Sequence, residues 1–436
     1  MTATTAARAG TGQGAAQRLL PLVEEFLGGR LPLRLRAWDG STAGSGGGPV
    51  VVLRSRRALR RLLWRPDELG LARAYVTGDL DVEGDLAEAL RTMWAAARHR
   101  ALAPPRLSAG DRARALRTAA RLGALGPRPP VPAAEARLTG ALHSRARDRA
   151  AISHHYDLSN AFYSLLLDET LAYSCAYWSG TEPEQTLAGA QHAKLELVCR
   201  KLGLQGGDRL LDVGCGWGSL TLYAAERYKV RVTAVTLAAE QAGHVRAQVR
   251  ERGLGELVDV RLRDYRDLDG GGYDAVSSIE MGEHVGDAEY PAFASLLHRM
   301  LRPGGRVLVQ QMSRGARAPG GGAFIASYIA PDMHMRPVGD TVSLLEGAGL
   351  EVRSVESLRE HYTRTVGAWR DTLEERWGEF SALVGEETAR VWRLYLVGGG
   401  LAFEERRMGV DQILAVRPAE DGGSGMPPTP GEWYAP

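Results

Sequence analysis

A short apolar segment followed by a glycine-rich turn constrains the fold of this chain more than any other feature. Residues 209–213 read Arg-Leu-Leu-Asp-Val, and the glycines that follow occupy every second position: Gly214, Gly216 and Gly218. This pattern predicts a buried strand that ends in a tight turn and leads into a helix over 220–227. Further apolar segments lie at 230–236, 258–261, 275–278 and 307–311, with helical patterns at 240–252 and 290–301. Their alternation predicts an α/β fold with a doubly wound, mostly parallel sheet.

The turn at the end of the first strand is predicted to bind a cofactor. Glycines allow the backbone to approach a ligand closely at the carboxyl end of a sheet. The G-x-G-x-G spacing differs from the G-x-G-x-x-G spacing of dinucleotide-binding turns. Asp212 precedes the glycines, a position that suits the methionine ammonium group of S-adenosylmethionine through ordered neighbours. We therefore expect the turn, with Gly214 and Gly216, to bind S-adenosylmethionine.

Polar residues after the next two strands favour the same cofactor. Thr236 ends the strand over 231–236 and Gln241 follows it, where polar side chains can meet the ribose hydroxyls. Asp264 and Tyr265 follow the strand over 258–261 and offer a carboxylate for the adenine amino group and a ring for stacking. The sequence thus predicts a class I methyltransferase domain with a Rossmann-like sheet.

Composition divides the chain into five expected segments. They are a disordered tail at 1–17, a smaller N-terminal α+β domain at 18–105, a basic helical linker at 106–150, the methyltransferase domain at 151–420 and a C-terminal tail at 421–436. Prolines bracket the basic helix expected at 112–125. In the α+β domain, the apolar spacing predicts helices at 20–27, 57–65 and 86–98 and strands at 31–38 and 49–53.

Positive charge gathers in the first part of the chain. Residues 1–150 hold 25 arginines and no lysine against 13 acidic residues, whereas the whole chain has a net charge of +2. This excess favours an anionic partner, either a phospholipid surface or nucleic acid, although a solvated arginine-rich face is an alternative. The odd number of cysteines is typical of a reducing cytoplasm, and the absence of zinc-ligand spacing means that no metal is expected. No apolar segment of about 18 residues predicts a membrane span.

Several ordered motifs give the chain a family resemblance. They lie at 155–163, 171–178, 210–218, 264–268, 278–286, 324–331, 361–365 and 409–412, and a weaker motif lies at 71–81. With these motifs the chain resembles the cyclopropane-fatty-acyl-phospholipid synthase family, which includes the actinobacterial enzymes of tuberculostearate formation. The match extends from about residue 150 to residue 418.

The resemblance implies a chemistry and the residues that perform it. Members of this family transfer a methyl group from S-adenosylmethionine to a cis double bond of a phospholipid acyl chain, and a base then removes a proton from the carbocation. That base is a bicarbonate ion held by a cysteine backbone group, a glutamate, a histidine and a tyrosine. The matching catalytic residues here are Cys175, Glu283 and Tyr362, and Tyr173 and Ser174 carry over as cofactor contacts. An aromatic wall is expected to exclude water and steady the cation; its candidates are Tyr173, Tyr177, Trp178 and Tyr328.

Three departures from the family pattern bear on the product. Gln310 stands where the family has a histidine, and we count it with the catalytic residues. Its amide can donate a hydrogen bond but cannot titrate. Whether bicarbonate binds here is therefore left open. Gly282 replaces a bulkier residue beside Glu283 and is expected to widen the pocket, and residues 332–337 lack a glycine-rich step. These departures favour the tuberculostearate branch, in which an oleoyl chain becomes a 10-methylene chain and a separate reductase completes the 10-methyl product. A cyclopropane ring is the alternative product.

The sequence leaves the role of a second glutamate and the class of partner open. Glu280 could serve the same network as Glu283 or only cap its strand. A nucleic-acid methyltransferase is less favoured, because no Asn-Pro-Pro-Tyr loop follows the fourth strand. We therefore expect phospholipid acyl chains and no nucleic acid as partners of a cytoplasmic protein that is peripheral at the inner membrane face. A homo-oligomer is left open.

Overall fold

The structure is a computed structural model with two compact units, Met1–Ala134 and Glu135–Pro436. It describes residues 13–99, 108–136, 144, 147, 160–180, 185–315 and 321–433. The beginning of the motif at 155–163 and most of the tail expected at 1–17 lie outside the described residues.

The N-terminal unit is a small α+β fold. Its sheet has the order β2-β1-β3-β4, in which only β1 and β3 pair in parallel. The strands are β1 (Arg34–Arg36), β2 (Thr42–Ala43), β3 (Val50–Leu53) and β4 (Leu80–Glu83). The helices are α1 (Ala15–Phe26), α2 (Arg56–Trp64), α3 (Glu68–Val76), α4 (Leu86–His99) and α5 (Ala109–Arg121). The three helices expected at 20–27, 57–65 and 86–98 correspond to α1, α2 and α4.

Helix α1 begins inside the segment expected as a disordered tail. Ala15 and Ala16 are buried, and their backbone N–H groups donate to Asp39 Oδ2 (2.7 Å) and Ser41 Oγ (2.9 Å). The first free N–H groups of a helix need such acceptors. Because these acceptors lie 24 and 25 residues away in the sequence, the local pattern could not reveal the start of the helix.

Helix α5 and the proline-rich segment after it differ from the linker expected at 106–150. Arg60 Nε donates to Ala124 O (3.1 Å), Arg61 Nη1 to Pro130 O (2.9 Å) and Trp64 Nε1 to Gly126 O (3.2 Å). These bonds attach the segment to α2, so it belongs to the N-terminal unit, which ends at Ala134. Side-chain donors to a distant backbone leave no signal in hydropathy.

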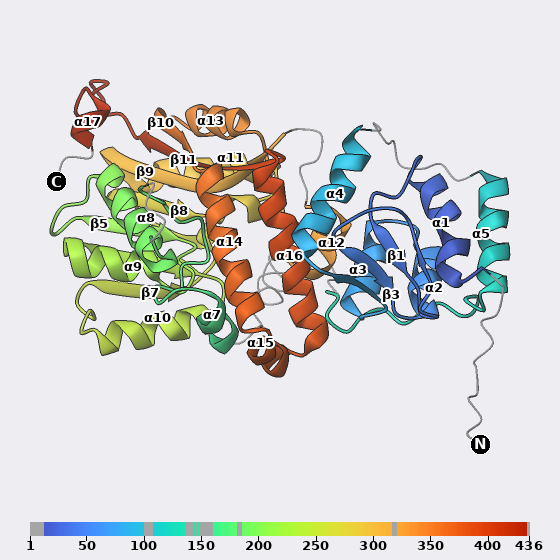
Figure 1. The fold of residues 1–436 in the computed structure, drawn as a ribbon. Coiled ribbons are helices and arrows are strands. Elements are labelled where there is room, and N and C mark those ends of the chain that lie inside the picture. The colour runs from blue at the N-terminus through green and yellow to red at the C-terminus, as the bar shows by residue number, and fades with distance from the viewer. Residues whose placement is uncertain are drawn as a thin grey trace, which may run out of the picture. The chain divides into compact units, whose positions relative to one another are not determined.

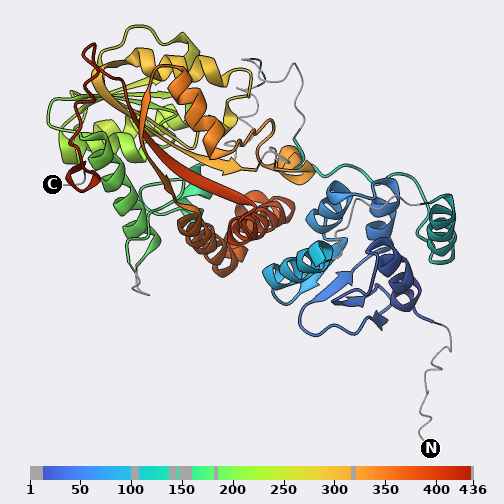
Figure 2. The same ribbon diagram turned by 90° about the horizontal axis from the view of Figure 1, so that it is seen from above.

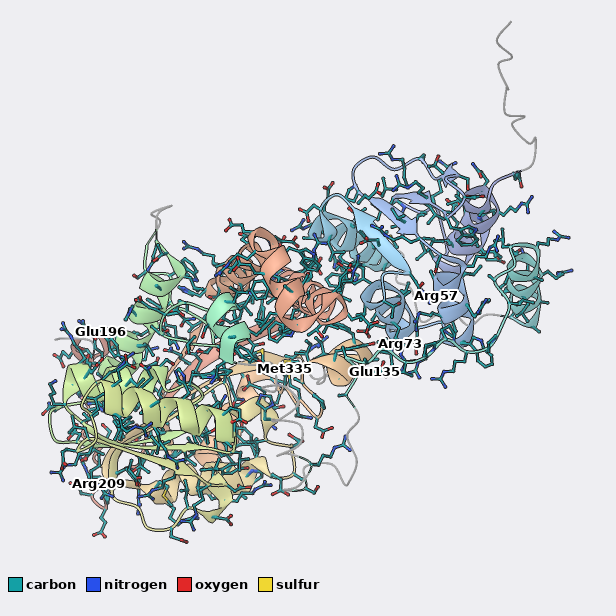
Figure 3. The ribbon with its side chains drawn as sticks, turned by 90° about the horizontal axis from the view of Figure 1, so that it is seen from below. Arg57, Arg73, Glu135, Glu196, Arg209 and Met335 are labelled. Carbon is teal, nitrogen blue, oxygen red and sulfur yellow. The ribbon has the colours of Figure 1, made fainter. Side chains whose placement is uncertain are left out.

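The weaker motif at 71–81 contains a buried acidic centre of the N-terminal unit. Asp79 accepts hydrogen bonds from Ser55 Oγ, Thr77 Oγ1, Arg57 Nε and Arg61 Nε. Burial alone would raise the pKa of Asp79, but the hydrogen bonds and the Arg57 charge hold it below the usual range. Arg57 on α2 and Arg73 on α3 are seen in Figure 3. The motif therefore joins α2, α3 and β4.

The second unit contains a seven-stranded sheet. Its order is β10-β11-β9-β8-β5-β6-β7, and β11 runs antiparallel to the other six strands. The strands are β5 (Arg209–Val213), β6 (Arg231–Thr236), β7 (Val258–Leu262), β8 (Tyr273–Ile279), β9 (Leu301–Arg314), β10 (Glu351–Ser357) and β11 (Met408–Val416). The strand order reverses at β5, between β6 and β8, which is where open α/β sheets bind ligands. The expected doubly wound α/β fold is confirmed (Figure 1).

Side chains alternate between two apolar layers along the central strands. Leu210 of β5 packs with α8 (Leu187–Leu202), α9 (Ser219–Tyr223) and α10 (Ala239–Glu251) on one face. Leu211 and Val213 pack with α11 (Tyr290–Met300) and α13 (Val338–Gly347) on the other face. The helix expected over 220–227 continues from α9 as a π-helical segment, Ala224–Tyr228. Both faces of the sheet are thus covered by helices.

A third apolar layer lies beside strand β11. It joins α7 (Asn160–Leu166), α14 (Arg359–Glu375), α15 (Trp377–Val384) and α16 (Glu386–Glu404). Figure 2 shows α14 to α16 as a group next to the start of β11. Two short helices, α12 (Ala323–Tyr328) and α17 (Pro430–Trp433), complete the described α-helices. No helix among the described residues is long and apolar enough to cross a membrane.

Candidate active site

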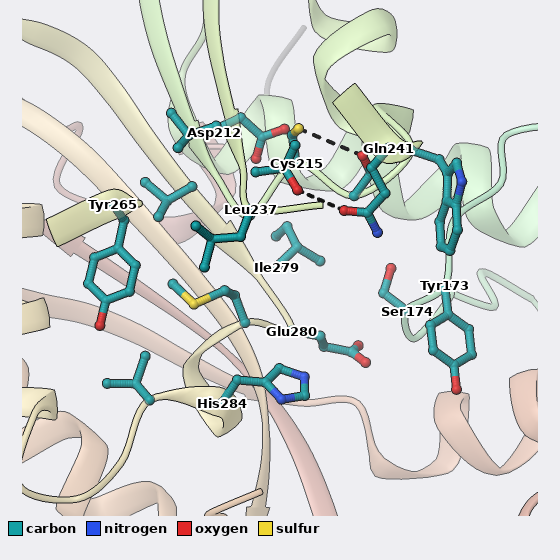
Figure 4. Close-up of a pocket in the computed structure, with 18 of the residues that line it drawn as sticks. Tyr173, Ser174, Asp212, Cys215, Leu237, Gln241, Tyr265, Ile279, Glu280 and His284 are labelled. Carbon is teal, nitrogen blue, oxygen red and sulfur yellow. Dashed lines mark hydrogen bonds between the residues drawn. The ribbon is translucent and has the colours of Figure 1, made fainter. Parts of the chain in front are cut away.

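A pocket opens where the carboxyl ends of β5, β6 and β8 meet. Figure 4 shows many of its lining residues, which come from the glycine turn after β5, the start of α10, the loops after β7 and β8 and the loop before α8. Most of the cofactor residues predicted from the sequence line it: Tyr173, Ser174, Asp212, Gly214, Gly216, Thr236, Gln241 and Tyr265. The one exception is Asp264, which is not among the lining residues. The predicted cofactor residues are therefore brought together by the fold.

The glycine turn has a backbone that side chains would disturb. Gly214, Gly216 and Gly218 all have positive φ angles, of 84°, 55° and 85°. A Cβ atom on Gly214 would lie 2.8 Å from Met281 Cγ, and one on Gly218 would lie 2.9 Å from Val245 Cγ2. The turn therefore requires glycine both for its conformation and for its close packing.

Asp212, which precedes this turn, is itself held by two hydrogen bonds. Its carboxylate accepts hydrogen bonds from Thr221 Oγ1 (2.7 Å) and Ser277 Oγ (2.9 Å), and it is 2 % exposed. Burial raises the pKa of Asp212 although both hydroxyl groups favour its charged form. Asp212 thus connects β5 to α9 and β8. This agrees with the expectation that Asp212 acts on the cofactor through the neighbouring residues that it orders.

The start of α10 offers an unused donor to the pocket. Thr236 Oγ1 donates to Gln241 Oε1 (2.8 Å), which fixes the orientation of the buried Gln241 amide. Its Nε2 has no partner among the described residues. A buried donor without a partner is costly, and a ribose hydroxyl of a nucleoside cofactor would satisfy it. The residues present therefore fit S-adenosylmethionine.

The loop after β7 meets the expectation only in part. The ring of Tyr265 lines the pocket and packs edge-on against Phe293. The carboxylate of Asp264 forms hydrogen bonds with Arg266 Nε (2.9 Å) and Nη2 (2.7 Å). Asp264 therefore shapes this loop, and the adenine contact predicted for its carboxylate stays a prediction.

A buried lysine that the sequence analysis missed stands beside Ser174. Lys194 Nζ donates to Ser174 Oγ (2.9 Å), and the lysine is 1 % exposed. Burial lowers the pKa of Lys194, whereas the charges of Glu280, Asp168 and Asp212 act against this shift. Lys194 lies within the ordinary helical pattern of α8, so that only the fold reveals that it reaches the pocket.

The predicted catalytic donors converge on Glu280. The Cys175 N–H donates to Glu280 Oε1 (2.7 Å), Gln310 Nε2 donates to the same oxygen (2.8 Å), and Tyr362 OH donates to Oε2 (2.5 Å). Burial raises the pKa of Glu280, and the three hydrogen bonds and the Lys194 charge oppose this shift. Glu280 lines the pocket, whereas its three donors lie behind it. The network is therefore centred on Glu280, whose role the sequence leaves open.

The Gln310 amide is oriented by a chain of further polar residues. Gln412 Nε2 donates to Gln310 Oε1 (2.8 Å), and Lys201 Nζ donates to Gln412 Oε1 (2.6 Å) and pairs with Glu356. Because Gln310 Oε1 accepts from Gln412, its Nε2 must face Glu280. Gln412 and Lys201 are members of the network that sequence reasoning missed.

Glu283 is buried near this network but outside it. It is 1 % exposed, and neither of its carboxylate oxygens accepts a hydrogen bond from a described side chain. Burial and the nearby Glu280 charge raise the pKa of Glu283 to about 8, and Arg336 acts in the opposite direction. Glu283 does not line the pocket. The catalytic role predicted for it stays a prediction.

Bicarbonate does not fit this arrangement. The Cys175 backbone, Gln310 and Tyr362, which the resemblance assigned to the ion, all donate to the Glu280 carboxylate. The expected widening at Gly282 is also not found, because a Cβ atom there would lie 1.9 Å from Gln311 Oε1. The Gln311 side chain fills that space.

The aromatic wall of the site differs from the expected one. Tyr173 lines the pocket, but Tyr177 stacks on His361 at 4.7 Å, and Trp178 Nε1 donates to Thr365. Tyr328 packs on Phe324 outside the lining. The rings around Tyr173 come instead from α7, α14 and α16: Tyr163, Trp369 and Trp392, with centroids at 5.7, 5.3 and 6.0 Å. These rings are far apart in the sequence, and their helical spacing is typical of any apolar core. The sequence pattern therefore does not single them out as part of the site.

Comparison with known proteins identifies the family. The sequence profile of the family described as mycolic acid cyclopropane synthetase matches residues 143–413. This chain belongs to that family. A relative from Pseudomonas putida, named "Probable fatty acid methyltransferase", is 40% identical over 415 residues, which cover 93% of this chain and 96% of the relative. "Tuberculostearic acid methyltransferase UfaA1" of Mycobacterium tuberculosis is 35% identical over 287 residues, or 63% of this chain and 66% of the relative.

A solved structure supports the same assignment. Mycolic acid cyclopropane synthase CmaA1, complexed with SAH and CTAB, is 34% identical with a TM-score of 0.57, covering 61% of this chain and 97% of that chain. The family resemblance, the class I methyltransferase fold and the enzyme class predicted from the sequence are confirmed. This member of the cyclopropane synthetase family is an S-adenosylmethionine-dependent methyltransferase.

Proposed function

We propose that this methyltransferase adds a methyl-derived carbon to the cis double bond of an oleoyl chain in a phospholipid. The observation that carries the proposal is the position of the Glu280 carboxylate, which lines the cofactor pocket and is held by three donors behind it. Among the described residues no group of histidine, cysteine and acidic side chains could hold a metal ion. The three cysteines are free and buried, and burial raises the pKa of Cys175 well above its usual value. An electron-rich substrate and a protein base are what such a site can use.

Aromatic rings next to the pocket suit a reaction that passes through a carbocation. When bound, S-adenosylmethionine supplies the methyl group that the double bond takes up, which leaves a carbocation on the acyl chain. The rings of Tyr173, Trp369 and Trp392 form a cluster next to the pocket. Aromatic faces attract a cation and keep water from adding to it. Tyr173 is fixed by the hydrogen bond between its hydroxyl and that of Tyr395 (3.1 Å).

The product that we propose is a 10-methylene chain. After methyl addition at C10, a hydride moves from C10 to C9, and loss of a proton from the new methyl group gives the methylene. Relatives named as fatty acid and tuberculostearic acid methyltransferases support this branch. A separate reductase would then be needed for a saturated 10-methyl product.

A phospholipid substrate would be reached at a membrane surface. We propose that the protein attaches peripherally to the cytoplasmic face of the membrane, where it would reach phospholipid acyl chains. Residues 1–150 carry 25 arginines against 13 acidic residues, and this excess suits such a surface. Anionic headgroups would attract such an excess of positive charge, and salt would weaken the attraction. Sedimentation with anionic and zwitterionic vesicles at two salt concentrations measures this contribution.

Mass spectrometry of released fatty acids tests the reaction. The full chain is incubated with S-adenosylmethionine and vesicles of dioleoyl-phosphatidylglycerol, with distearoyl-phosphatidylglycerol as the matched lipid that lacks double bonds. We expect the oleoyl acid to gain the mass of one CH2 group and the stearoyl acid to stay unchanged. No gain in the oleoyl acid would contradict the proposal, and methylation of an added DNA duplex would favour the nucleic-acid alternative.

A further inference from the structure

The Glu280 carboxylate is held in one place by three independent parts of the second unit. Its donors are the backbone of the loop before α8, the amide of Gln310 on β9 and the hydroxyl of Tyr362 on α14. A carboxylate has acceptor capacity for about four hydrogen bonds. Three of these bonds come from the protein interior, so that the carboxylate retains acceptor capacity on the side where Glu280 lines the pocket.

The backbone at Glu280 is also shaped for this position. Its φ angle is +49°, a left-handed conformation that non-glycine residues rarely adopt, and its N–H donates to Gln310 O (2.6 Å). Such a conformation costs free energy of about 1–3 kcal/mol, which the surrounding structure must offset. Strain of this kind gathers at functional sites.

We propose that the Glu280 carboxylate is itself the base of the reaction and takes the place of an external bicarbonate ion. This inference rests on the proposed function. In the step, a C–H bond of the new methyl group breaks, its electron pair fills the empty orbital of the cation, and the proton passes to a Glu280 carboxylate oxygen. The protonated Glu280 then releases the proton to solvent through the pocket that it lines. No oxidant, reductant or further reactant is needed.

The charge distribution agrees with this role. A proton next to a carbocation is strongly acidic, so the base needs to be ionised and correctly placed more than it needs a high pKa. The hydrogen bonds from Tyr362, Cys175 and Gln310 favour the ionised form of Glu280 against burial. Burial and the Glu280 charge raise the pKa of the neighbouring Glu283 to about 8. The three hydrogen bonds therefore favour Glu280 over Glu283 as the member of the pair that carries the negative charge.

Replacement of Glu280 by glycine gives a direct test. Glycine adopts the positive φ angle without strain, and the Glu280→Gly variant leaves three donors around a space that an anion can enter. We expect wild-type turnover to be the same in carbonate-free buffer and with added bicarbonate. The Glu280→Gly variant should lose turnover by about 10²–10⁴-fold in carbonate-free buffer and regain part of it with bicarbonate. Glu280→Gln keeps the shape but cannot take a proton, and it should stay inactive under both conditions.

A binding measurement separates this inference from the proposed function. Isotope-edited infrared spectra with 13C-bicarbonate report the bound ion without any turnover. We expect bound-ion bands in Glu280→Gly and none in the wild type or in the exposed control variant Glu256→Gln. Bound bicarbonate in the wild type, bicarbonate-stimulated wild-type turnover, or an active Glu280→Gln variant would each overturn the proposal. If no lipid is methylated at all, the proposed function fails, while the infrared spectra still decide whether Glu280 fills the anion site.

Discussion

The hydroxyl of Tyr362 donates a hydrogen bond of 2.5 Å to Glu280 Oε2, and the two residues lie 82 positions apart in the sequence. Burial and the Glu280 charge raise the pKa of Tyr362 well above its usual value, so the hydroxyl keeps its proton and stays a donor. This bond joins helix α14 to the end of strand β8. It is the shortest of the three bonds that hold the carboxylate.

Tyr362→Phe removes this donor and should weaken the base form of Glu280. A hydrogen bond to a charged group contributes about 1.5–3 kcal/mol, so the pKa of Glu280 should rise by about one to two units. The acid limb of the pH–rate profile should then move to higher pH, and turnover at a fixed pH on that limb should fall about 10- to 100-fold. Tyr228→Phe, in the core layer under α8 to α10, is the control. An unchanged acid limb in Tyr362→Phe would contradict the account.

Glu283→Gln should change how stability depends on pH. The pKa of Glu283 rises from 4.5 to about 8 on folding, so the native state binds a proton that the unfolded state releases. This contribution is fully present below pH 4.5 and is lost as the pH rises toward about 8. Denaturant unfolding from pH 5 to 8 should show that the variant gains stability over the wild type by at most about 1.4 kcal/mol for each pH unit. A difference that does not change with pH would show that Glu283 titrates normally. Glu256→Gln is the exposed control.

Gln241→Ala should weaken cofactor binding. The free Nε2 group of Gln241 lies in the pocket next to Thr236, and loss of its hydrogen bond to a ribose hydroxyl would cost about 1–3 kcal/mol. Calorimetric titration with S-adenosylhomocysteine should therefore give a Kd raised about 5- to 100-fold. Gln248→Ala, on the same helix but outside the pocket lining, should leave the Kd unchanged. Equal values for Gln241→Ala and the wild type would place the ribose elsewhere.

Gly214→Ala and Gly216→Ala separate conformation from packing in the glycine turn. Both residues have positive φ angles, so alanine should cost about 1–2 kcal/mol at either position. Only at Gly214 would the new Cβ also press on Met281, at 2.8 Å, whereas nothing lies within 4 Å at Gly216. Thermal unfolding of the cofactor-free variants should therefore give a lower Tm for Gly214→Ala than for Gly216→Ala. The difference corresponds to an additional loss of about 1–3 kcal/mol in the free energy of unfolding. Equal Tm values would mean that Met281 moves without cost.

The parts of the fold that local patterns determine could be predicted from the sequence. Strand β5 has the predicted bounds, 209–213, because a run of apolar residues ends there at the glycines. The cofactor residues Thr236 and Gln241 could be predicted because they lie at the end of the next strand, β6, and just after it. The sequence pattern does not show that the proline-rich segment after α5 belongs to the N-terminal unit, because its attachment depends on arginine donors 64 and 69 residues away.

The centre of the hydrogen-bond network around Glu280 could not be predicted in the same way. Family motifs pointed to Cys175, Gln310 and Tyr362, and the structure brings them together. They surround Glu280, however, from sequence distances of 105, 30 and 82 residues. No local spacing distinguishes Glu280 from Glu283. The fold distinguishes them, because Glu280 accepts three hydrogen bonds whereas neither carboxylate oxygen of Glu283 accepts one from a described side chain.

The most direct test of the account is 13C NMR of the fatty acids released after reaction of the full chain with methyl-13C-labelled S-adenosylmethionine and dioleoyl-phosphatidylglycerol vesicles. The account predicts that the labelled carbon appears as an olefinic CH2 carbon on the acyl chain. A labelled carbon at high field, with cyclopropyl protons, would contradict the proposed product, and the absence of label from the lipid would contradict the proposed reaction itself.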